Sequence, residues 1–573
     1  MARESMTRLL LIGAAGLDWP GVNARIEAGE APNLAALRAR GAAGWLRGWP
    51  PFEGPAPWTT LVTGRYPEAH GVWRTQEAWA AGARPVSRAS WRAAPLWARL
   101  AEAGVSTGSV GWPAARPGAA WAGDHVDRDF AVATGRSHDD WALPLDCAPP
   151  DAREALRDLR VHPSEITGDM LAPLVPGLSQ LDQSRDTALP HLAVAMAQAA
   201  SIQAAAAWLL TERRPAAVFV HHEWLAVAAG AFERHTQGPF ARVVDGAWRF
   251  FDGLVGRLAE LAGPDALVVV ASPGWRQNPG VAIAAGPGVA PDGFQGAEAV
   301  DLAPSLLAAF GLEDRTLPGQ AIPALAPEGP RRPAPEVAIP PAPPADFDLL
   351  REAIAAGHPA PPPLTPDWWA GGFSELAFTT LQRDARTALA AADAALERKP
   401  DHAPALDAKA VAHVLLDEPD PLPDLAAALR KAAPQQGWGD LAEAAWLVMQ
   451  ERSTEAGPHI RAAERDRDPD FLARVAAVWF AAGQPAEAAR VFQDLLALDA
   501  GSVTARVGLG AAAAARRDFR AAEQHLVAAV RLDPGRRPAW AQLADVYRKT
   551  GRVAEGDRAA RLAESGPPPV PAR

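Results

Sequence analysis

The sequence predicts an α/β domain with a mainly parallel sheet, followed by an all-helical repeat domain. Short apolar runs alternate with helical stretches over residues 8 to about 320, which is typical of parallel sheets whose faces are covered by helices. Proline then becomes dense from about 318 to 365. Beyond this segment, Ala, Leu, Arg and Glu follow a helical periodicity interrupted by regularly spaced turn signals.

Length and composition require more than one core. A chain of 573 residues exceeds the size at which a single hydrophobic core keeps growing. Hydrophobic residues make up 49% and charged residues 21%, as in ordinary globular chains. The net charge of -11 comes from acids and bases that are interleaved along the chain, which gives no basic footprint for nucleic acid and no polybasic patch for anionic lipid.

Cysteine usage and hydropathy indicate the compartment. Cys147 is the only cysteine, so neither an internal disulfide nor a Cys-based zinc site is possible, and a reducing compartment is the simplest interpretation. The apolar run Leu9 to Ile12 is shorter than the apolar core of a signal peptide and fits a buried strand better. No stretch reaches the roughly 18 uninterrupted apolar residues of a membrane span. We therefore expect a cytoplasmic protein without a membrane span.

Five apolar runs are the expected strands of the α/β domain. Each is short and is followed by turn or helix signals. The runs are Leu9 to Ile12, Val105 to Val110, Ala217 to Val220, Ala266 to Val270 and Val281 to Ala284. The proline-dense segment, which contains the run Ile339 to Pro344, reads as a stiff linker. The predicted domains are therefore residues 1–325 and 366–573, joined by a linker over 326–365.

The C-terminal half resembles the tetratricopeptide repeat. Turn signals fall at Pro400, Pro434, Pro469, Ala500 and Pro534, at spacings of 34, 35, 31 and 34 residues, and a period near 34 is that of this helix-turn-helix repeat. Three units from 469 onward match its pattern of small and apolar residues closely, whereas 437–468 departs from it. The resemblance implies a solenoid whose groove binds a protein or peptide.

Several motifs follow one another along the N-terminal half. They are Leu10 to Gly13, Gly16 to Trp19, Ala31 to Leu37, Pro57 to Val72 and Asp301 to Leu307. In this order they resemble the type I phosphodiesterase/nucleotide pyrophosphatase branch of the alkaline phosphatase superfamily, and the segment Pro57 to Val72 is the closest match. This resemblance implies an alkaline-phosphatase-like, mainly parallel sheet sandwiched by helices. It also implies a site at the carboxyl ends of the strands, where active members hold two metal ions on Asp and His and use a Ser or Thr nucleophile.

The residues that this resemblance places at the site cannot perform that chemistry. The family's first Asp and its nucleophile fall on Ala15 and Gly54, its Asp-x-x-x-His pair on Trp224 and Ala228, its Asp-His pair on Ser272 and Pro273, and its last His near Arg276. A divalent ion needs about four to six ligands. The sequence therefore predicts a degenerate site with no catalytic residue, metal or cofactor, in which the large indole of Trp224 fills part of the vacated space.

Two alternatives remain open at the sequence level. One is a rebuilt metal site on the consecutive residues His221, His222 and Glu223, which would make the chain a phosphate-ester or phosphodiester hydrolase. Neighbouring residues of a strand point to opposite faces, which argues against this. The other alternative is a non-catalytic sensor that binds a phosphorylated or sulfated ligand. Thr59 and Thr60 are interpreted as hydrogen-bonding residues, and Asp18 as a helix cap.

The favoured hypothesis is an inactive phosphodiesterase-like scaffold that recruits a protein or peptide through its repeat groove. The first helix of each repeat is expected to line this groove. Its expected lining is a mostly apolar strip with a charged end, formed by Ala473, Ala477, Phe480, Val507, Ala511, Asp545 and Arg548. Such a strip suits an apolar helix of the partner.

Overall fold

The computed structural model consists of two compact units, residues 1–362 with 569–573, and residues 363–568. The structure describes residues 8–48, 54–72, 75–79, 82–115, 121–133, 137–141, 143, 147–176, 178, 188–232, 238, 240–275, 278–291, 293–326, 329–337, 374, 377–378, 381, 384–498, 502–532 and 536–565. Most of the expected linker lies outside these residues.

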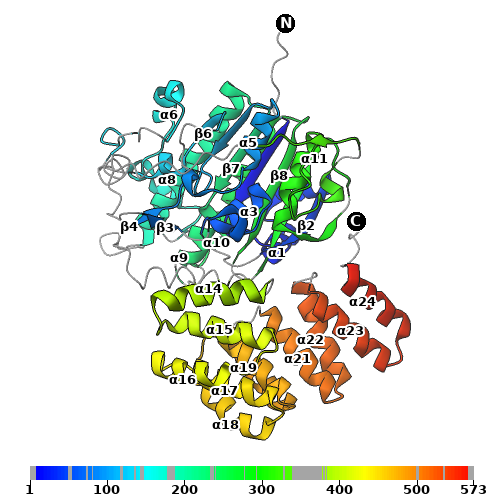
Figure 1. Cartoon of the computed structure of the whole chain (residues 1–573). Coiled ribbons are helices and arrows are strands. Elements are labelled where there is room, and N and C mark those ends of the chain that lie inside the picture. The colour runs from blue at the N-terminus through cyan, green and yellow to red at the C-terminus, as the bar shows by residue number, and fades with distance from the viewer. Residues whose placement is uncertain are drawn as a thin grey trace. The chain divides into compact units, whose positions relative to one another are not determined.

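An eight-stranded sheet forms the centre of the first unit (Figure 1). Its order is β10-β2-β9-β8-β1-β7-β5-β6, and β9 is antiparallel to both of its neighbours while the other pairs are parallel. The strands are β1 (Leu9–Ala14), β2 (Ala42–Arg47), β5 (Thr107–Val110), β6 (Asp124–Val126), β7 (Ala217–His222), β8 (Leu267–Trp275), β9 (Asn278–Ala285) and β10 (Phe294–Glu298). The predicted mainly parallel sheet is confirmed, and all five expected strands are present within it.

The central strands are buried on both faces, which explains their uninterrupted apolar sequences. In β1, Leu10 and Ile12 belong to one core cluster and Leu9 and Leu11 to another, because successive side chains point to opposite faces of a strand. The strands β7 and β8 alternate between the same two clusters. A sheet of this kind needs a helical layer on each side.

Helices cover both faces of the sheet. The first cluster contains side chains from α1 (Trp19–Glu27), α2 (Pro32–Ala39), α8 (Ala188–Trp208), α9 (Trp224–Phe232) and α10 (Val243–Ala262). The second contains side chains from α3 (Ala56–Thr63), α5 (Leu96–Glu102) and α11 (Leu302–Ala309). Short helices α4 (Pro67–His70), α6 (Arg153–Arg157) and α7 (Gly168–Leu171) lie in the connections. The α/β unit is therefore a three-layer sandwich, as predicted.

Two small sheets accompany the main one. The strands β3 (Gln76–Trp79) and β4 (Gly82–Pro85) form an antiparallel hairpin. The strands β11 (Leu312–Glu313) and β12 (Arg332–Pro333) pair in parallel. The β12 residues fall within the segment expected as linker, so the α/β domain extends at least to Pro333.

One helical stretch of this domain is long and apolar enough to cross a membrane by length and composition. It runs from Ala188 to Arg213, comprising α8 and a π-helical turn, with a mean hydropathy of 1.4. In its most apolar window, 56% of the helix is buried inside the protein, and Leu192, Ala199 and Ile202 pack into the first core cluster. A core helix has the same properties, so this stretch gives no clear evidence of a membrane span.

The second unit is a stack of helical pairs that resembles a tetratricopeptide-repeat solenoid, as predicted (Figure 1). First helices of successive pairs begin at Ala403, Trp438, Pro469, Val503 and Arg537, at spacings of 35, 31, 34 and 34 residues. After α14 (Ala385–Arg398), the helices are α15 (Ala403–Leu415), α16 (Leu422–Ala432), α17 (Trp438–Met449), α18 (Ser453–Ala463), α19 (Pro469–Ala481), α20 (Pro485–Leu498), α21 (Val503–Ala515), α22 (Phe519–Leu532), α23 (Arg537–Lys549) and α24 (Val553–Ser565).

The pair α17 and α18 is regular although its sequence departs from the repeat pattern. Leu441 and Leu447 of α17 and Ile460 of α18 are buried together with Trp479 of the next pair. Burial of an apolar stripe is what stabilises most protein helices, and this pair retains such a stripe despite Pro458 within α18. In the last pair, Leu543 is buried, whereas Trp540 and Tyr547 are half-buried against the same core cluster.

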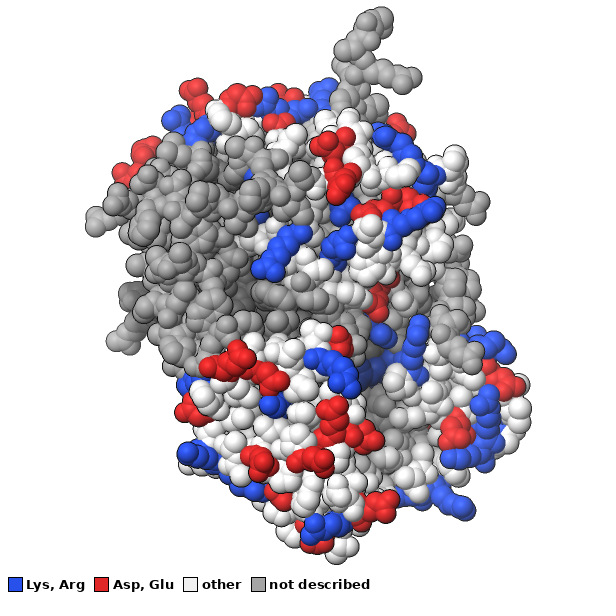
Figure 2. All heavy atoms as spheres, viewed as in Figure 1, with Lys and Arg blue, Asp and Glu red and all other residues white. Residues whose placement is uncertain are grey.

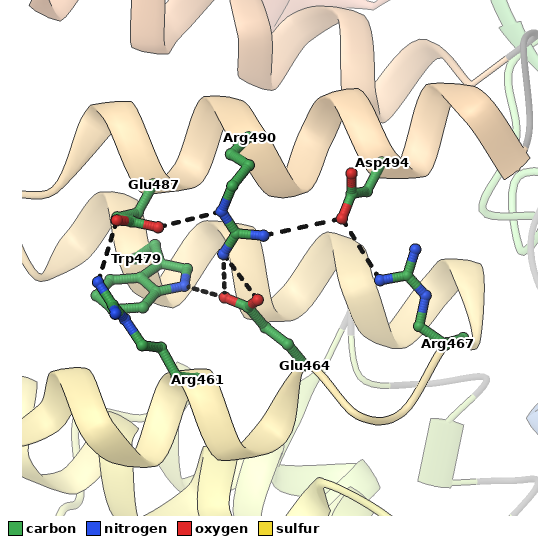
Figure 3. Close-up of polar contacts among 7 residues, drawn as sticks. All are labelled: Arg461, Glu464, Arg467, Trp479, Glu487, Arg490 and Asp494. Carbon is green, nitrogen blue, oxygen red and sulfur yellow. Dashed lines mark hydrogen bonds and ion pairs between the residues drawn. The ribbon is translucent and has the colours of Figure 1, made fainter.

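Charged side chains connect consecutive pairs on the surface of this unit (Figure 3). Arg490 of α20 forms two contacts with Glu464, at 2.6 and 2.7 Å, and Trp479 Nε1 donates to the same carboxylate at 2.8 Å. Glu487 accepts from Arg461 and Arg490, both at 3.2 Å. The visible face in Figure 2 also intersperses acidic with basic side chains. Exposed pairs of this kind contribute little individually, and their contribution to stability becomes appreciable when several charges form a network, as they do here.

A buried ion pair spans three helical pairs of the repeat array. Asp407 of α15 accepts two hydrogen bonds from Arg474 of α19, both at 2.7 Å. The Asp407 side chain is only 4% exposed, and that of Arg474 is 34% exposed. A bidentate guanidinium-carboxylate pair has a fixed geometry. The pair therefore holds the first helices α15 and α19 at a set separation.

Removal of this carboxylate should destabilise the repeat array. In Asp407→Ala the Arg474 charge loses its buried partner, and the free energy of unfolding should decrease by about 2 kcal/mol. This decrease is smaller than the usual one for a fully buried pair, because Arg474 is partly solvated. Urea titration followed by circular dichroism at 222 nm measures it. The matched control is Asp393→Ala, which removes the half-exposed partner of Lys409 and should change stability by less than about 0.5 kcal/mol. Equal effects would show that the buried pair has no special role.

Candidate functional site

The candidate site lies at the carboxyl ends of β7, β1 and β8, which are neighbours in the sheet. Ala14 pairs with His222, and Gly13 pairs with Ala271, so the ends of these strands lie at one edge. Open parallel sheets carry their binding sites at this edge. The residue after β1 is Ala15.

The structure brings five of the six positions expected at the site to this edge. Trp224 and Ala228 lie in α9, directly after β7, and Ser272 and Pro273 are buried near the end of β8. Gly54 is different, because it is exposed just before α3, and a Cβ added there would meet only the Thr75 methyl, at 3.8 Å. The position near Arg276 lies outside the described residues.

Main-chain contacts close the space between the end of β1 and the start of α9. The Ala15 N–H donates to the His222 carbonyl at 2.9 Å, and the Ala226 N–H donates to the Ala15 carbonyl at 3.0 Å. Gly16 has a φ of +88°, and a Cβ there would lie 2.4 Å from the Ala226 nitrogen. Only glycine allows this approach. The first turn of α9 therefore rests directly on the loop after β1.

Trp224 is part of the core next to this contact. It is 2% exposed, and its Nε1 donates to the Ala247 carbonyl of α10 at 2.9 Å. Its ring packs edge-on against Phe250 at 5.2 Å, and Ala228 is buried in the same cluster. The indole thus occupies an apolar space with its one polar group satisfied.

The two histidines at the end of β7 point to opposite faces of the sheet. The His221 ring lies edge-on to Trp58 at 4.3 Å and to Trp112 at 5.7 Å, whereas the His222 ring faces Phe251 of α10 at 6.4 Å. They cannot ligate one ion together without a rearranged backbone. Within the described part of the chain, no three His, Cys, Asp or Glu side chains gather closely enough to hold a metal ion.

Both histidines are neutral near pH 7. Burial lowers the pKa of His222 to about 4, and burial, with Arg128 and His222 as weaker causes, lowers the pKa of His221 well below its usual range. Neither nitrogen of the His222 ring has a hydrogen-bond partner among the described residues. Such unsatisfied buried groups are uncommon in native proteins.

Thr60 and His70 form a pair whose geometry resembles a nucleophile with its base, since Thr60 Oγ1 lies 3.0 Å from His70 Nε2. However, the Val72 N–H donates to His70 Nδ1 at 3.1 Å, so Nδ1 is the acceptor and Nε2 carries the proton. A protonated Nε2 donates to the hydroxyl and cannot take its proton. Both side chains are also buried. The pair is a structural link between α3 and α4.

Thr59 and Asp18 have the local roles that the sequence indicates. Thr59 Oγ1 donates to the Pro55 carbonyl at 3.0 Å. Asp18 caps α1, accepting from the Gly21 N–H at 2.7 Å. Its other oxygen accepts from the Asn278 side chain at 2.7 Å, and burial raises the pKa of Asp18 despite these hydrogen bonds. Sequence analysis missed Asn278, because its partner is 260 residues away in the chain.

A comparison with known protein families gives a match for the α/β domain. Residues 9–275 match the model described as type I phosphodiesterase / nucleotide pyrophosphatase. The α/β domain belongs to this family. A search among curated proteins finds no match for the chain.

Solved structures resemble the helical part of the chain. They include the human IFIT1 dimer with PPP-AAAA (16% identity, 38% of this chain, 55% of that one, TM-score 0.31), Pseudomonas aeruginosa pilF (18%, 35%, 92%, 0.28) and YrrB, a TPR protein with an unusual peptide-binding site (22%, 30%, 89%, 0.21). The chain spans little more than half the length of IFIT1.

The residues expected in the repeat groove lie on three first helices, outside the fully buried core. Ala473, Ala477 and Phe480 are on α19, Val507 and Ala511 on α21, and Asp545 and Arg548 on α23. Phe480 is 39% exposed. Asp545 pairs with Lys549 at 2.6 Å and Arg548 with Asp557 at 3.0 Å. Because α19 packs beside α21 and α21 beside α23, these residues lie on neighbouring helices.

The aromatic contacts in the phosphodiesterase-family domain require glycine at position 13. A Cβ there would lie 3.0 Å from Trp58 Cζ3 and 3.2 Å from both His221 Cδ2 and Trp112 Cη2. Gly13→Ala should therefore lower the free energy of unfolding by about 1 to 3 kcal/mol, as overpacked cores do. Chemical denaturation monitored by tryptophan fluorescence measures it.

The matched control is Gly253→Ala, which lies in the exposed part of α10 with no atom within 4 Å of the added methyl. Alanine in a helix is more favourable than glycine by about 0.5 to 1 kcal/mol, so this variant should be stabilised. A Gly13→Ala protein as stable as the natural chain would contradict the described packing of Trp58 and Trp112.

Acidification should destabilise the phosphodiesterase-family domain through His222. Its folded pKa of about 4 lies below the unfolded value of about 6.5, so the unfolded state binds a proton that the folded state does not. The stabilisation from neutral His222 is thus complete above pH 6.5 and is lost towards pH 4, with a slope of about 1.4 kcal/mol per pH unit. The free energy of unfolding, measured at pH 7, 6 and 5, should fall less steeply with decreasing pH in His222→Phe than in the natural chain. Identical slopes in the two proteins would show that His222 is not the cause of the acid destabilisation.

Proposed function

We propose that this chain is a catalytically inactive phosphodiesterase-like scaffold whose repeat domain binds a protein or peptide partner. The proposal of catalytic inactivity rests on the residues at the edge formed by the carboxyl ends of β7, β1 and β8. The family's chemistry needs carboxylates and imidazoles there, and the residues at the corresponding positions are Ala15, Trp224, Ala228, Ser272 and Pro273.

The packing at this edge also supports inactivity. The hydrogen bonds between Ala15, His222 and Ala226 bring the loop after β1 into direct contact with the first turn of α9. An ion bound between these elements would have to break main-chain hydrogen bonds that no side chain could replace. A rebuilt site on His221 and His222 would need both rings on one face of the sheet.

Partner binding is supported by the surface of α19, α21 and α23. Ala477 and Phe480 are exposed and Val507 and Ala511 are half-buried, so an apolar strip crosses neighbouring first helices. Exposed contiguous apolar surface commonly marks a binding site. We infer that the partner presents the apolar face of an amphipathic helix, which is a frequent mode of recognition in such grooves. Because the single cysteine needs no oxidising compartment, we place this function in the cytoplasm.

The catalytic half of the proposal is tested on the purified full-length protein. Incubation with Zn²⁺ or Mn²⁺, desalting and elemental analysis should give well below one metal ion per chain. Hydrolysis of bis(p-nitrophenyl) phosphate and p-nitrophenyl phosphate should not exceed the buffer blank. Turnover that is lost in a His221→Ala or His222→Ala variant would overturn the proposal in favour of a rebuilt hydrolase.

The binding half is tested by substituting the apolar strip. Phe480→Glu should abolish co-purification of the partner from an extract of the native cells, because a buried carboxylate would face the partner's apolar side chains. The matched control is Leu498→Glu, which alters an apolar residue of α20 that is 51% exposed and lies outside the strip. Quantitative mass spectrometry compares the two with the natural chain. A partner retained by Phe480→Glu, or lost equally from both variants, would contradict binding at this strip.

A further inference from the structure

A small pocket lies beside the closed phosphodiesterase edge. It is about 50 Å³ in volume and is enclosed by α8, the 3₁₀ turn Arg128–Ala131, the end of β7 and the start of α9. Its apolar wall includes Ile202 and Val227. Its polar lining residues are Gln198, His221, His222, Arg128 and Glu223. Because one water molecule needs about 10 to 15 Å³ of such space, the pocket can accommodate a molecule of only a few heavy atoms.

An unsatisfied imidazole lies at the base of this pocket. His222 is 2% exposed, and neither ring nitrogen has a hydrogen-bond partner among the described residues. Burying polar groups without partners is unfavourable, and such groups are normally satisfied by a ligand, a water or an ion. A neutral imidazole offers one donor and one acceptor. Gln198 on α8 adds an amide with both functions.

The mouth of the pocket carries one positive and one negative group. Arg128 and Glu223 pair at 2.7 Å, and their side chains are 49% and 37% exposed. An exposed ion pair contributes little stability, so a ligand can separate it at low cost when it satisfies both partners. The charges of Arg128 and Glu223 cancel, so this part of the pocket has no net positive charge that would attract a doubly charged anion.

We propose that this pocket binds a small dipolar molecule of the amino-acid class. Its carboxylate, which has about four lone-pair sites, accepts from Arg128 and from the donors of His222 and Gln198, and its ammonium lies on Glu223. A planar guanidinium matches a carboxylate in two parallel hydrogen bonds. The apolar wall accommodates a short aliphatic side chain. A phosphorylated or sulfated ligand fits less well, because Glu223 would repel it. This binding is independent of partner recruitment by the repeat domain.

The test is isothermal titration calorimetry of the full-length protein at low ionic strength, with glycine, L-alanine and β-alanine as probes. At least one probe should bind saturably with one site per chain. Acetate and methylammonium, which each carry only one of the two charges, should bind at least tenfold more weakly. Inorganic phosphate and sulfate should show no saturable heat.

Charge-removing variants distinguish a dipolar ligand from a simple anion. Arg128→Gln and Glu223→Gln should each weaken the bound amino acid at least tenfold, because each removes one pole. An anion site would instead lose affinity in Arg128→Gln and gain it in Glu223→Gln, where the competing carboxylate is gone. The matched control is Arg157→Gln, an exposed arginine paired with Asp158, which should leave affinity unchanged.

Three outcomes would overturn the proposal. These are stronger binding by Glu223→Gln, equal binding of acetate and the amino acids, and the absence of binding by all three dipolar probes up to 10 mM. The last result would mean that water alone satisfies His222. None of these outcomes affects the proposals that the protein is catalytically inactive and that its repeat domain binds a partner, because separate assays test those proposals.

Discussion

The approach of the loop after β1 to the first turn of α9 is the constraint on which the candidate site depends. Gly16 permits it by adopting a positive φ, and the hydrogen bond from Ala226 to Ala15 fixes it. A β-strand followed by a helix normally leaves a crevice at this edge. Here main chain occupies the crevice. The packing of the backbone thus acts in the same direction as the proposed loss of the ligand residues, because an ion would need both charged side chains and open space.

The two faces of the sheet differ in polarity next to this edge, where the loop after β1 contacts α9. On one face His221 is enclosed by Trp58 and Trp112, where an imidazole acts as a flat, weakly polar ring. On the other face His222 lines a pocket with Arg128 and Glu223 at its mouth. Two consecutive residues therefore contribute to an aromatic core and to a polar cavity. The alternation of side chains along β7 is sufficient to separate these roles.

The central strands could be predicted from sequence because both of their faces are buried and their apolar runs are unbroken. The edge strands β6 and β10 could not be predicted, for a physical reason. Asp124 to Val126 is three residues long and begins with polar side chains, and Phe294 to Glu298 has no apolar run, so neither carries a periodic signal. Strands at the edges of a sheet need less apolar surface, and their sequences resemble loops. This reason does not apply to β2, which is buried.

The same distinction applies to the site. The order of motifs along the chain predicts which positions of the expected site lack carboxylates. The helix cap formed by Asp18 can be predicted from its place before a helix. The partners Asn278 for Asp18 and Arg128 for Glu223 were not readable, because residues far apart in sequence carry no local pattern. Whether His70 acts as a base could also not be inferred, since the Val72 N–H decides its tautomer.

Small residues determine the character of the proposed binding surface of the repeat domain. A Cβ on Gly508 would lie 2.2 Å from the Phe492 ring, and one on Gly510 would lie 2.5 Å from Leu526, so α21 packs closely between α20 and α22. The same helix presents short side chains such as Val507 and Ala511 along the expected groove, and these side chains offer no hydrogen bonds. In the proposed complex, affinity would therefore come from large apolar side chains of the partner, with Phe480 as the main aromatic contact from this chain.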